Sequence, residues 1–313
     1  MGKREEFLWS AKYRPLTVKD CILPDSIKGI FTDFLSQGEI QHMIFSGSSG
    51  VGKTTVAMAL CEELGSDYII INGSSEAGID VLRTKITDFV TSVSLNGKPK
   101  VVIIDEADGM NPNSIQPALR NFLETFSSNS RFIFTCNYAN KIIAPLKSRC
   151  KTIEFKLDKQ DRPKMASRFM KRLSFILEAE DVEYDSKVVA QVLTRFFPDY
   201  RKILNELQSY SLKGSIDEGV LSHVKDVDIS NLVDALRGKD FKLVRQWVEN
   251  NLDNNVHEVL DRVYDTLIDQ IVEVPNLVLI IADWNYKSYF AANQKINLSA
   301  CFVEIMASTN FKE

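Results

Sequence analysis

Residues 47–54 read Gly-Ser-Ser-Gly-Val-Gly-Lys-Thr and match the pattern G-x-x-x-x-G-K-S/T without a gap. The apolar run at 43–45 before them predicts a strand, and the run at 55–60 after them predicts a helix. Glycines let backbone N–H groups approach a polyphosphate, and the following helix directs its positive end at the anion. An ordinary Gly/Ser-rich turn is the alternative, but both flanks have the order that a phosphate-binding loop needs. The chain is therefore expected to contain a strand–loop–helix unit that binds a nucleoside triphosphate.

The polar groups of this loop have separate expected roles. Lys53 is expected to reach the β- and γ-phosphates, and the Thr54 hydroxyl is expected to ligate Mg²⁺. The other positions offer mainly backbone N–H groups to the phosphates. The nucleotide-binding residues expected in the loop and its helix are Gly47, Ser49, Gly50, Val51, Gly52, Lys53, Thr54 and Thr55.

A second motif closes a strand that is apolar at every residue from 101 to 104, as expected for a strand buried on both faces. Asp105 and Glu106 follow it. Ligands bind at the carboxyl edge of parallel sheets, so these carboxylates are expected beside the phosphate loop. Asp105 would hold Mg²⁺, directly or through water, and Glu106 would polarise the attacking water as general base. Together the two motifs indicate an NTP hydrolase rather than a kinase, which needs a second-substrate hydroxyl site.

Two more polar residues lie beside later strand candidates. Asn137 ends the run at 131–136 and is expected at the γ-phosphate or the attacking water, although Asn is also a common turn residue. Arg149 lies just before the last strand candidate, where it cannot easily reach its own phosphate and is placed to serve a neighbouring subunit. For each residue taken alone, an ordinary surface role is the alternative.

Strand and helix patterns alternate over residues 1–157, which predicts an α/β fold with a parallel sheet covered on both faces. The strand candidates are 43–46, 67–71, 101–105, 131–136 and 152–155, and the helical candidates are 26–37, 53–64, 79–93 and 112–125. After Leu157 the strand signals stop, and short helices are expected at 164–178, 186–196 and 200–211. A polar break at 225–228 opens a third, all-helical segment.

Composition limits the compartment and the partners. The 313 residues are 44% hydrophobic and 26% charged, as in soluble globular proteins, and the start lacks the apolar core of a signal peptide. The apolar run at 277–282 is too short to span a bilayer. A cytoplasmic protein without a membrane partner is therefore expected. The net charge of −4 gives no overall basic field for nucleic acid, although a local basic face is compatible with it.

The order of these motifs resembles that of AAA+ clamp-loader ATPases. The matching segments are 47–54, 105–108, Asn137, Ser148-Arg149-Cys150 and 197–201, and the Ser-Arg-Cys triplet is typical of clamp loaders. Residues 9–15, Trp-Ser-Ala-Lys-Tyr-Arg-Pro, resemble the W-x-x-K-Y-R-P segment that packs on adenine in this family. Segments 21–24, 71–74, 119–124 and 197–210 are most similar to the clamp-loader ATPase subunits of T4-type bacteriophages.

The resemblance implies ATP and Mg²⁺ as cofactors, with Tyr13 and Arg14 at the adenine. It implies that Asn137 is the first sensor and that Arg201 is a lid-domain sensor on the phosphates of the same subunit. It also implies that Arg149 is an arginine finger inserted into the ATP site of the adjacent subunit.

The implied organisation has three domains and five subunits. An AAA+ core is expected at 1–157, a helical lid at 158–226 and a helical collar for oligomerisation at 227–313. The family implies four copies of this chain and one different small phage subunit. In such an assembly ATP drives the opening of a ring-shaped sliding clamp, and primer–template DNA triggers hydrolysis and release of the clamp onto DNA.

DNA coupling is where the sequence departs from the family. Cellular relatives carry a basic residue just before Gly-Ile-Asp that is thought to restrain the catalytic glutamate until DNA binds, and here that position is Ala77. Another residue is expected to take its place. DNA phosphates are expected to meet Arg83, Lys85 and Arg120, which lie on helices that face the ring interior in the family; ordinary solvated helix charges are the alternative.

Two other functions share part of this motif pattern. A hexameric AAA+ DNA motor of the branch-migration type shares the nucleotide motifs, but the Ser-Arg-Cys triplet and a helical C-terminus without a winged-helix pattern argue against it. A nonhydrolytic scaffold that keeps the fold is opposed by the intact Lys53, Thr54, Asp105, Glu106 and Arg149.

Overall fold

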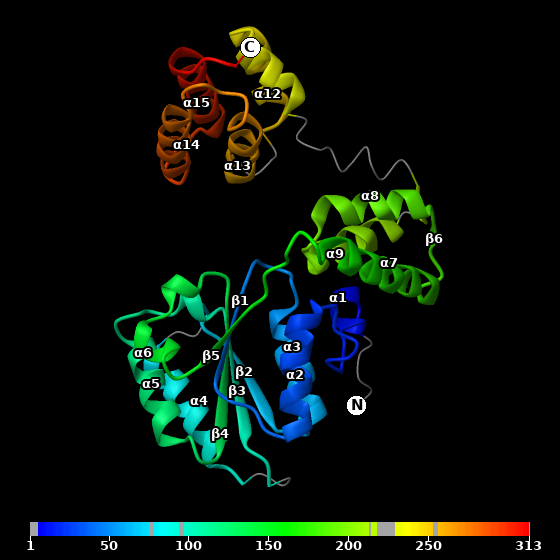
Figure 1. Cartoon of the computed structure of the whole chain (residues 1–313), viewed down its shortest axis with the longest axis vertical. Helices are drawn as coiled ribbons and strands as arrows, with labels where there is room; N and C mark the ends of the chain where they lie inside the picture. Colours follow the sequence, from blue (N-terminus) through cyan, green and yellow to red (C-terminus); the bar gives the residue numbers. More distant parts are fainter. Residues whose placement is uncertain are drawn as a thin grey trace. The chain divides into compact units, whose positions relative to one another are not determined.

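The computed structural model of the chain describes residues 6–75, 78–93, 97–212, 214–217, 229–252 and 256–312. The chain divides into two compact units, residues 1–221 and residues 222–313. Figure 1 shows that the first unit contains a sheet with helices packed beside it and that the second unit is built of helices. The two units are described one after the other.

A five-stranded parallel sheet forms the centre of the first unit, with strand order β2-β3-β4-β1-β5. The strands are β1 (Met43–Ser46), β2 (Tyr68–Asn72), β3 (Lys100–Asp105), β4 (Ser130–Cys136) and β5 (Lys151–Glu154). β1 lies between β4 and β5, and all four of its residues are buried because helices cover both faces. The predicted parallel α/β fold is confirmed, and each strand lies within one residue of its predicted bounds.

Two helical layers cover the sheet, and alternate strand residues serve each layer. The helices α2 (Asp25–Gln37) and α3 (Lys53–Leu64) pack on one face, where Phe45 and Ile103 point. The helices α4 (Ile79–Thr91), α5 (Ile115–Thr125) and α6 (Ala144–Lys147) pack on the other, where Ile44 and Ile104 point (Figure 1). The short elements of this part are α1 (Trp9–Lys12), η1 (Ala107–Gly109) and η2 (Ala139–Lys141).

A helical layer follows the sheet within the same unit. It contains α7 (Arg162–Ala179), α8 (Ser186–Phe196) and α9 (Tyr200–Ser211). Asp185 and Asp199 cap α8 and α9 by accepting backbone N–H groups, and each capping residue directly precedes its helix. The prediction that strands stop after Leu157 is wrong in one detail, because β6 (Glu183–Tyr184) pairs in parallel with β7 (Ser215–Ile216). Strands of two residues are too short to produce a readable alternation.

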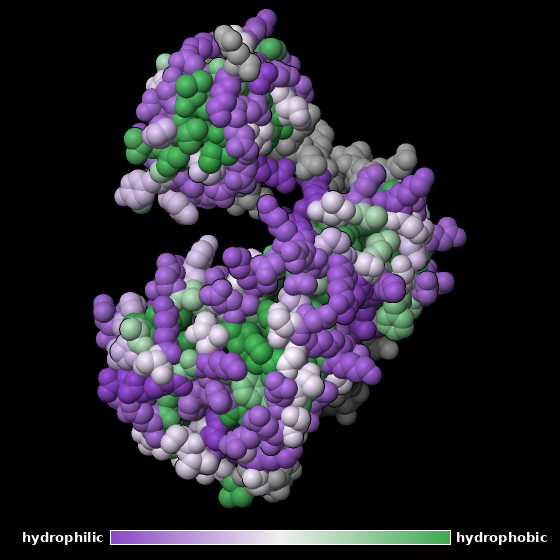
Figure 2. Space-filling view, in the orientation of Figure 1, coloured by the Kyte–Doolittle hydropathy of each residue, from purple (hydrophilic) through white to green (hydrophobic). Residues whose placement is uncertain are grey.

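In the described part of the second unit the regular elements are helices, and an isolated antiparallel bridge joins Ile271 to Phe311. Its helices are α11 (Ser230–Arg237), α12 (Phe241–Asn250), α13 (Val256–Leu267), α14 (Val274–Ser288) and α15 (Gln294–Ser308). The apolar stripe of α13 is buried in the core of this unit at Val259, Leu260, Val263 and Leu267, and Ile271, four residues after the end of the helix, is buried with it. Hydrophobic side chains also gather on its surface in Figure 2. Exposed apolar residues here include Leu279, Tyr286, Tyr289, Phe290 and Ile296. In the described parts of the chain, every helix is too short or too polar to cross a bilayer.

Candidate nucleotide-binding site

Lys53 occupies the first position of α3 and gathers the groups around the phosphate loop. Its Nζ donates to the carbonyl oxygens of Gly47 at 2.8 Å and Ser48 at 2.7 Å, and to Asn137 Oδ1 at 2.9 Å. The residue is 8% exposed, and this burial lowers the pKa of the lysine from its ordinary value. The predicted neighbourhood of Lys53 and Asn137 is therefore present, because β1 and β4 are adjacent strands that end side by side.

The loop needs glycine at two positions for different reasons. Gly52 has φ of 91°, in the left-handed region that favours glycine, and its carbonyl oxygen accepts the bond from Val56 N–H in the first turn of α3. Gly50 has φ of 72°, and a Cβ there would lie 1.8 Å from Asp199 Oδ1. Tyr200 N–H donates to Gly50 O at 3.1 Å. The start of α9 thus lies directly against the phosphate loop.

A hydroxyl and a carboxylate that suit Mg²⁺ lie next to each other. Thr54 Oγ1 donates to Asp105 Oδ1 at 2.7 Å, and Thr135 Oγ1 donates to the same oxygen. Oxygen ligands of these two kinds, completed by water and phosphate oxygens, are what Mg²⁺ usually takes, so Thr54 and Asp105 fit the ion. The part played by Thr135 was missed in the sequence, because only the β3–β4 pairing places it beside Asp105.

Glu106 has an unusual backbone, with φ of 54° and ψ of 44°. A non-glycine residue in this left-handed region costs about 1–2 kcal/mol. Local bonds hold the conformation: Glu106 N–H donates to Thr135 Oγ1 at 3.3 Å, and Gly109 N–H donates to Glu106 O at 2.9 Å. The residue that was predicted to polarise water is therefore kept in a fixed, strained position at the end of β3.

The Glu106 side chain is held by Ser74, in the turn after β2. Ser74 Oγ lies within hydrogen-bond distance of Glu106 Oε2 and 2.7 Å from Asn72 Oδ1. Asn72 Oδ1 already accepts the N–H groups of Ser74 at 2.8 Å and Ser75 at 3.1 Å, so we assign the hydroxyl proton to the charged carboxylate. Ala77, the position where cellular relatives carry a basic residue, lies outside the described residues.

Asp108 connects the loop after β3 to the end of β4. Its Oδ2 accepts the backbone N–H groups of Asn137 and Tyr138, both at 3.1 Å. This carboxylate therefore fixes the backbone that carries the Asn137 amide. The sequence placed Asp108 in the acidic motif but did not indicate this contact.

The segment that resembles the adenine-packing motif lies against α7. Arg172 Nη2 donates to Tyr13 O at 3.0 Å, and Tyr13 Oη donates to Glu180. Hydrogen bonds from Lys12 first, and then from Tyr13, lower the pKa of the Glu180 carboxyl. Arg14 Nη1 contacts Met58 Sδ at 3.2 Å, and its buried Nε has no hydrogen-bond partner among the described residues. Tyr13 and Arg14 thus lie beside the helical layer, where they form one wall of the pocket described next.

One pocket brings together almost all of the predicted nucleotide residues. It is lined by Tyr13, Arg14, Ser49, Gly50, Val51, Gly52, Lys53, Thr54, Thr55, Asp105, Glu106, Asn137 and Arg201, with Phe169, Arg172 and Tyr200 from the helical layer. Gly47 lies in an adjoining groove with Ser48 and Asn137. Arg149 is absent from both linings. It lies at the opposite edge of the sheet, just before β5, where it forms an ion pair with Glu124.

The residues expected to meet DNA are all exposed. Arg83 and Lys85 lie on α4, and Arg120 lies on α5, which packs on the same face of the sheet. Arg83 Nη1 lies 3.8 Å from Asp80 Oδ1. These positions are compatible with phosphate contacts and equally with solvated helix charges.

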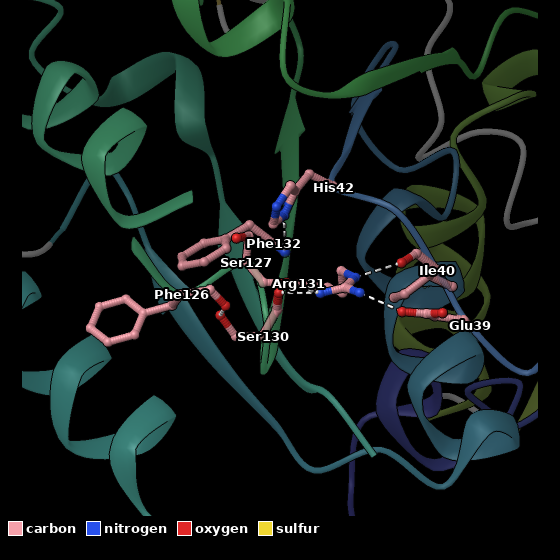
Figure 3. Close-up of polar contacts among 8 residues, drawn as sticks. All are labelled: Glu39, Ile40, His42, Phe126, Ser127, Ser130, Arg131 and Phe132. Atoms are coloured by element: carbon pink, nitrogen blue, oxygen red, sulfur yellow. Dashed lines mark hydrogen bonds and ion pairs between the residues drawn. The ribbon is translucent and has the colours of Figure 1, made fainter. Parts of the chain in front are cut away.

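The amino edge of the sheet contains a second polar cluster, shown in Figure 3. The Arg131 guanidinium donates to Ile40 O at 2.8 Å and to Ser130 O at 2.9 Å, as well as to Ser127 O and Glu39. It thereby joins the connection before β1 to the turn before β4. Beside it, Phe132 N–H donates to His42 Nδ1 at 3.1 Å, and burial followed by the Arg131 charge lowers the pKa of His42 to about 4.

Comparison with known proteins agrees with this geometry. Residues 43–157 match the model of the ATPase family associated with various cellular activities, and residues 161–222 match that of the sliding-clamp-loader large subunit AAA+ ATPase lid domain. The chain is 35% identical to the sliding-clamp-loader large subunit of Enterobacteria phage T4 over 98% of both chains. This chain belongs to the clamp-loader family of AAA+ ATPases. The predicted resemblance to that family is confirmed.

Relatives of this chain also occur outside phages. The chain is 38% identical to the replication factor C small subunit of Saccharolobus solfataricus, over 76% of this chain and 73% of that protein. Among solved structures, the RuvB Holliday junction branch migration motor of Thermotoga maritima superposes with a TM-score of 0.52, covering 79% of this chain and 80% of that one. At 17% identity this likeness shows the AAA+ fold alone.

Proposed function

We propose that this clamp-loader-family chain is the ATPase subunit of a phage sliding-clamp loader. ATP binding opens a ring-shaped clamp, and primer–template DNA stimulates hydrolysis and clamp release. The observation that carries the proposal is the pocket, which is lined by thirteen residues predicted to bind or hydrolyse the nucleotide. The phage relatives that match 98% of this chain are named as sliding-clamp-loader large subunits.

Within the pocket each residue has a chemical task. Lys53 exchanges its bonds to the Gly47 and Ser48 carbonyls for β- and γ-phosphate oxygens, and Thr54 and Asp105 hold Mg²⁺. The ion neutralises charge on the phosphates when bound. Glu106 accepts a proton from the attacking water. Asn137 orients that water or the γ-phosphate.

Arg201, from α9, completes the pocket on the side of the helical layer. Its guanidinium reaches the phosphates of the same subunit and so links α9 to the bound nucleotide. Tyr13 and Arg14 receive the adenine, and the Arg14 Nε that has no described partner is available to the base or ribose.

Arg149 acts on the neighbouring subunit. It lies outside the pocket of its own chain, at the opposite sheet edge, and is well placed to serve as a finger only for another copy. The assembly contains four copies of this chain and one different small phage subunit, with the three-domain division at 1–157, 158–226 and 227–313. Exposed apolar side chains such as Leu279 and Phe290 support a role of the last domain in oligomerisation. The assembly works in the host cytoplasm.

Primer–template DNA meets Arg83, Lys85 and Arg120 through its phosphates. Because Arg120 lies on α5 and Arg83 and Lys85 on α4, the two helices present their charges from one face of the sheet. In the absence of a basic residue at Ala77, Ser74 restrains Glu106 until DNA binds.

The deciding experiment measures ATP hydrolysis by this chain co-expressed with its small partner, with and without primer–template DNA and the cognate clamp. We expect stimulation when both are present. Arg149→Ala should keep ATP binding and lose hydrolysis, and mixing with a Lys53→Ala subunit that retains Arg149 should restore part of it. Hydrolysis that ignores DNA and clamp would contradict the proposal. A mass corresponding to six copies would favour the hexameric motor instead.

A further inference from the structure

The Arg149 side chain is held within its own subunit by a carboxylate. Nε donates to Glu124 Oε1 at 2.8 Å, and Nη2 donates to the same oxygen. Nη1 donates to Pro145 O at 2.9 Å, and Ser148 Oγ lies 3.4 Å from it. Glu124 thus engages one side edge of the guanidinium.

Both partners of this ion pair are attached to fixed backbone. Glu124 lies in the last turn of α5, directly after Leu123, which is buried against the sheet. Arg149 lies between Leu146 and Cys150, which pack in the same hydrophobic cluster. The separation of carboxylate and guanidinium is therefore determined by one core rather than by two mobile loops.

The end edge of the guanidinium, formed by Nη1 and Nη2, is the part that Glu124 does not cover. A guanidinium has five N–H groups in a planar fork. The side edge formed by Nε and Nη2 is engaged by Glu124, and Nη1 donates to Pro145 O and, over a longer 3.4 Å, to Ser148 Oγ. A phosphate oxygen can replace the long contact to the Ser148 hydroxyl, and the end edge formed by Nη1 and Nη2 then matches two oxygens of a phosphate.

We propose that Glu124 is a positioning residue for Arg149, which it orients so that the end edge of the guanidinium faces the γ-phosphate on the neighbouring copy. The inference rests on the proposed role of Arg149 in trans. The pair is partly exposed, with 35% of the Arg149 side chain and 50% of the Glu124 side chain accessible, so its effect on folding stability is small. The ion pair instead orients the Arg149 side chain. Because the side chain is already held in one rotamer, it loses less conformational freedom when it reaches the phosphate.

The test uses the complete assembly with clamp and primer–template DNA. For Glu124→Ala we expect kcat to fall about threefold to tenfold while KM for ATP stays within about twofold, since only finger alignment changes. Glu124→Gln keeps an acceptor oxygen and should recover much of the loss. Glu178→Ala, which removes another exposed glutamate near the end of a helix, is the matched control and should leave kcat unchanged.

Two further measurements separate alignment from a general structural effect. In an Arg149→Ala background, Glu124→Ala should cause no additional loss. In mixed assemblies, the defect should follow the subunit that donates the finger, including one that also carries Lys53→Ala. Equal losses in both backgrounds, or faster hydrolysis by Glu124→Ala, would overturn the inference. If Arg149→Ala itself leaves hydrolysis intact, the trans role fails; if it is inactive and the Glu124 variants are normal, only the positioning role fails.

Discussion

Charged residues at the two edges of the same parallel sheet differ in how many of their donors are bonded to the protein. At the carboxyl edge, Lys53 bonds to carbonyls of its own loop, and the buried Arg14 Nε and Tyr200 hydroxyl lack described partners. At the amino edge, Arg131 bonds to three carbonyl oxygens and a carboxylate (Figure 3). A site that must exchange partners keeps bonds that a ligand can replace, whereas a site that joins two connections has its donors engaged by the protein.

The largest expected effect is the loss of ATP hydrolysis at the carboxyl edge in a variant that still folds. Glu106→Gln keeps the size of the side chain and the Ser74 contact but removes the proton acceptor. Hydrolysis should fall by about 10²–10⁴-fold while ATP still binds, because general-base catalysis is usually worth that much. Steady-state hydrolysis and equilibrium binding of a fluorescent ATP analogue measure the two properties. Undiminished turnover would remove Glu106 from the mechanism.

At the amino edge the expected loss is stability. Arg131→Met keeps the aliphatic length but leaves the carbonyls of Ile40, Ser127 and Ser130 without their donor. We expect the free energy of unfolding to fall by about 2–3 kcal/mol, since the Ile40 and Ser130 bonds are partly buried and an acceptor stranded there costs about 1–3 kcal/mol, whereas the Ser127 bond is exposed. Urea denaturation measures this. Lys19→Met, on an exposed loop, is the control and should change stability by less than about 0.5 kcal/mol.

His42 makes the amino edge sensitive to acid. Its pKa of about 4 in the folded chain lies below the ordinary 6.5, so the unfolded chain takes up the proton first as the pH falls. The contribution of neutral His42 to the free energy of unfolding is fully present above pH 6.5. It is lost as the pH falls from 6.5 to 4, and amounts to about 1–2 kcal/mol after allowing for the partly exposed ring. His42→Asn keeps an acceptor for Phe132 N–H and should flatten this part of the stability–pH curve. An unchanged slope would show that other groups control it.

The smallest expected effect concerns the restraint on Glu106. Ser74→Ala removes the hydroxyl bond and should raise hydrolysis without DNA by about twofold to fivefold, the worth of one hydrogen bond to a charged group that is partly solvated. The DNA-stimulated rate should change less, so the ratio of the two rates should fall. Ser75→Ala is the matched control, because its side chain has no described contact with Glu106. A lower rate without DNA would show that Ser74 assists Glu106 rather than restrains it.

Much of the fold was predictable because its signals are local. The strand at Met43–Ser46 and the helices at Lys53–Leu64 and Ser186–Phe196 have the predicted bounds, since apolar runs, glycines and capping residues mark them in the sequence. The helix expected at 112–125 begins later, at Ile115. Asn111 explains the delay, because its side chain accepts Asn113 N–H and its carbonyl oxygen accepts Ile115 N–H, which forms a turn first.

The contacts that hold the pocket were less predictable because they depend on strand order. Thr135 reaches Asp105 only because β4 lies next to β3, and Ser74 reaches Glu106 only because β2 lies on the other side. Both strand pairs are consecutive along the chain, but the sequence does not give the register that brings these side chains together. The sequence did not indicate a role for Glu124 either, since an exposed glutamate near a helix end is common. Its role is visible only in the structure, which places Arg149 beside it.

The left-handed backbone of Glu106 also bears on how this chain can diverge. Glycine, asparagine and aspartate tolerate that conformation better than glutamate, so selection for folding alone would replace Glu106. Hydrolysis is the opposing selection. A descendant copy that no longer hydrolyses ATP is therefore expected to drift first at this position, and a glutamate kept there marks a lineage that still turns over its nucleotide.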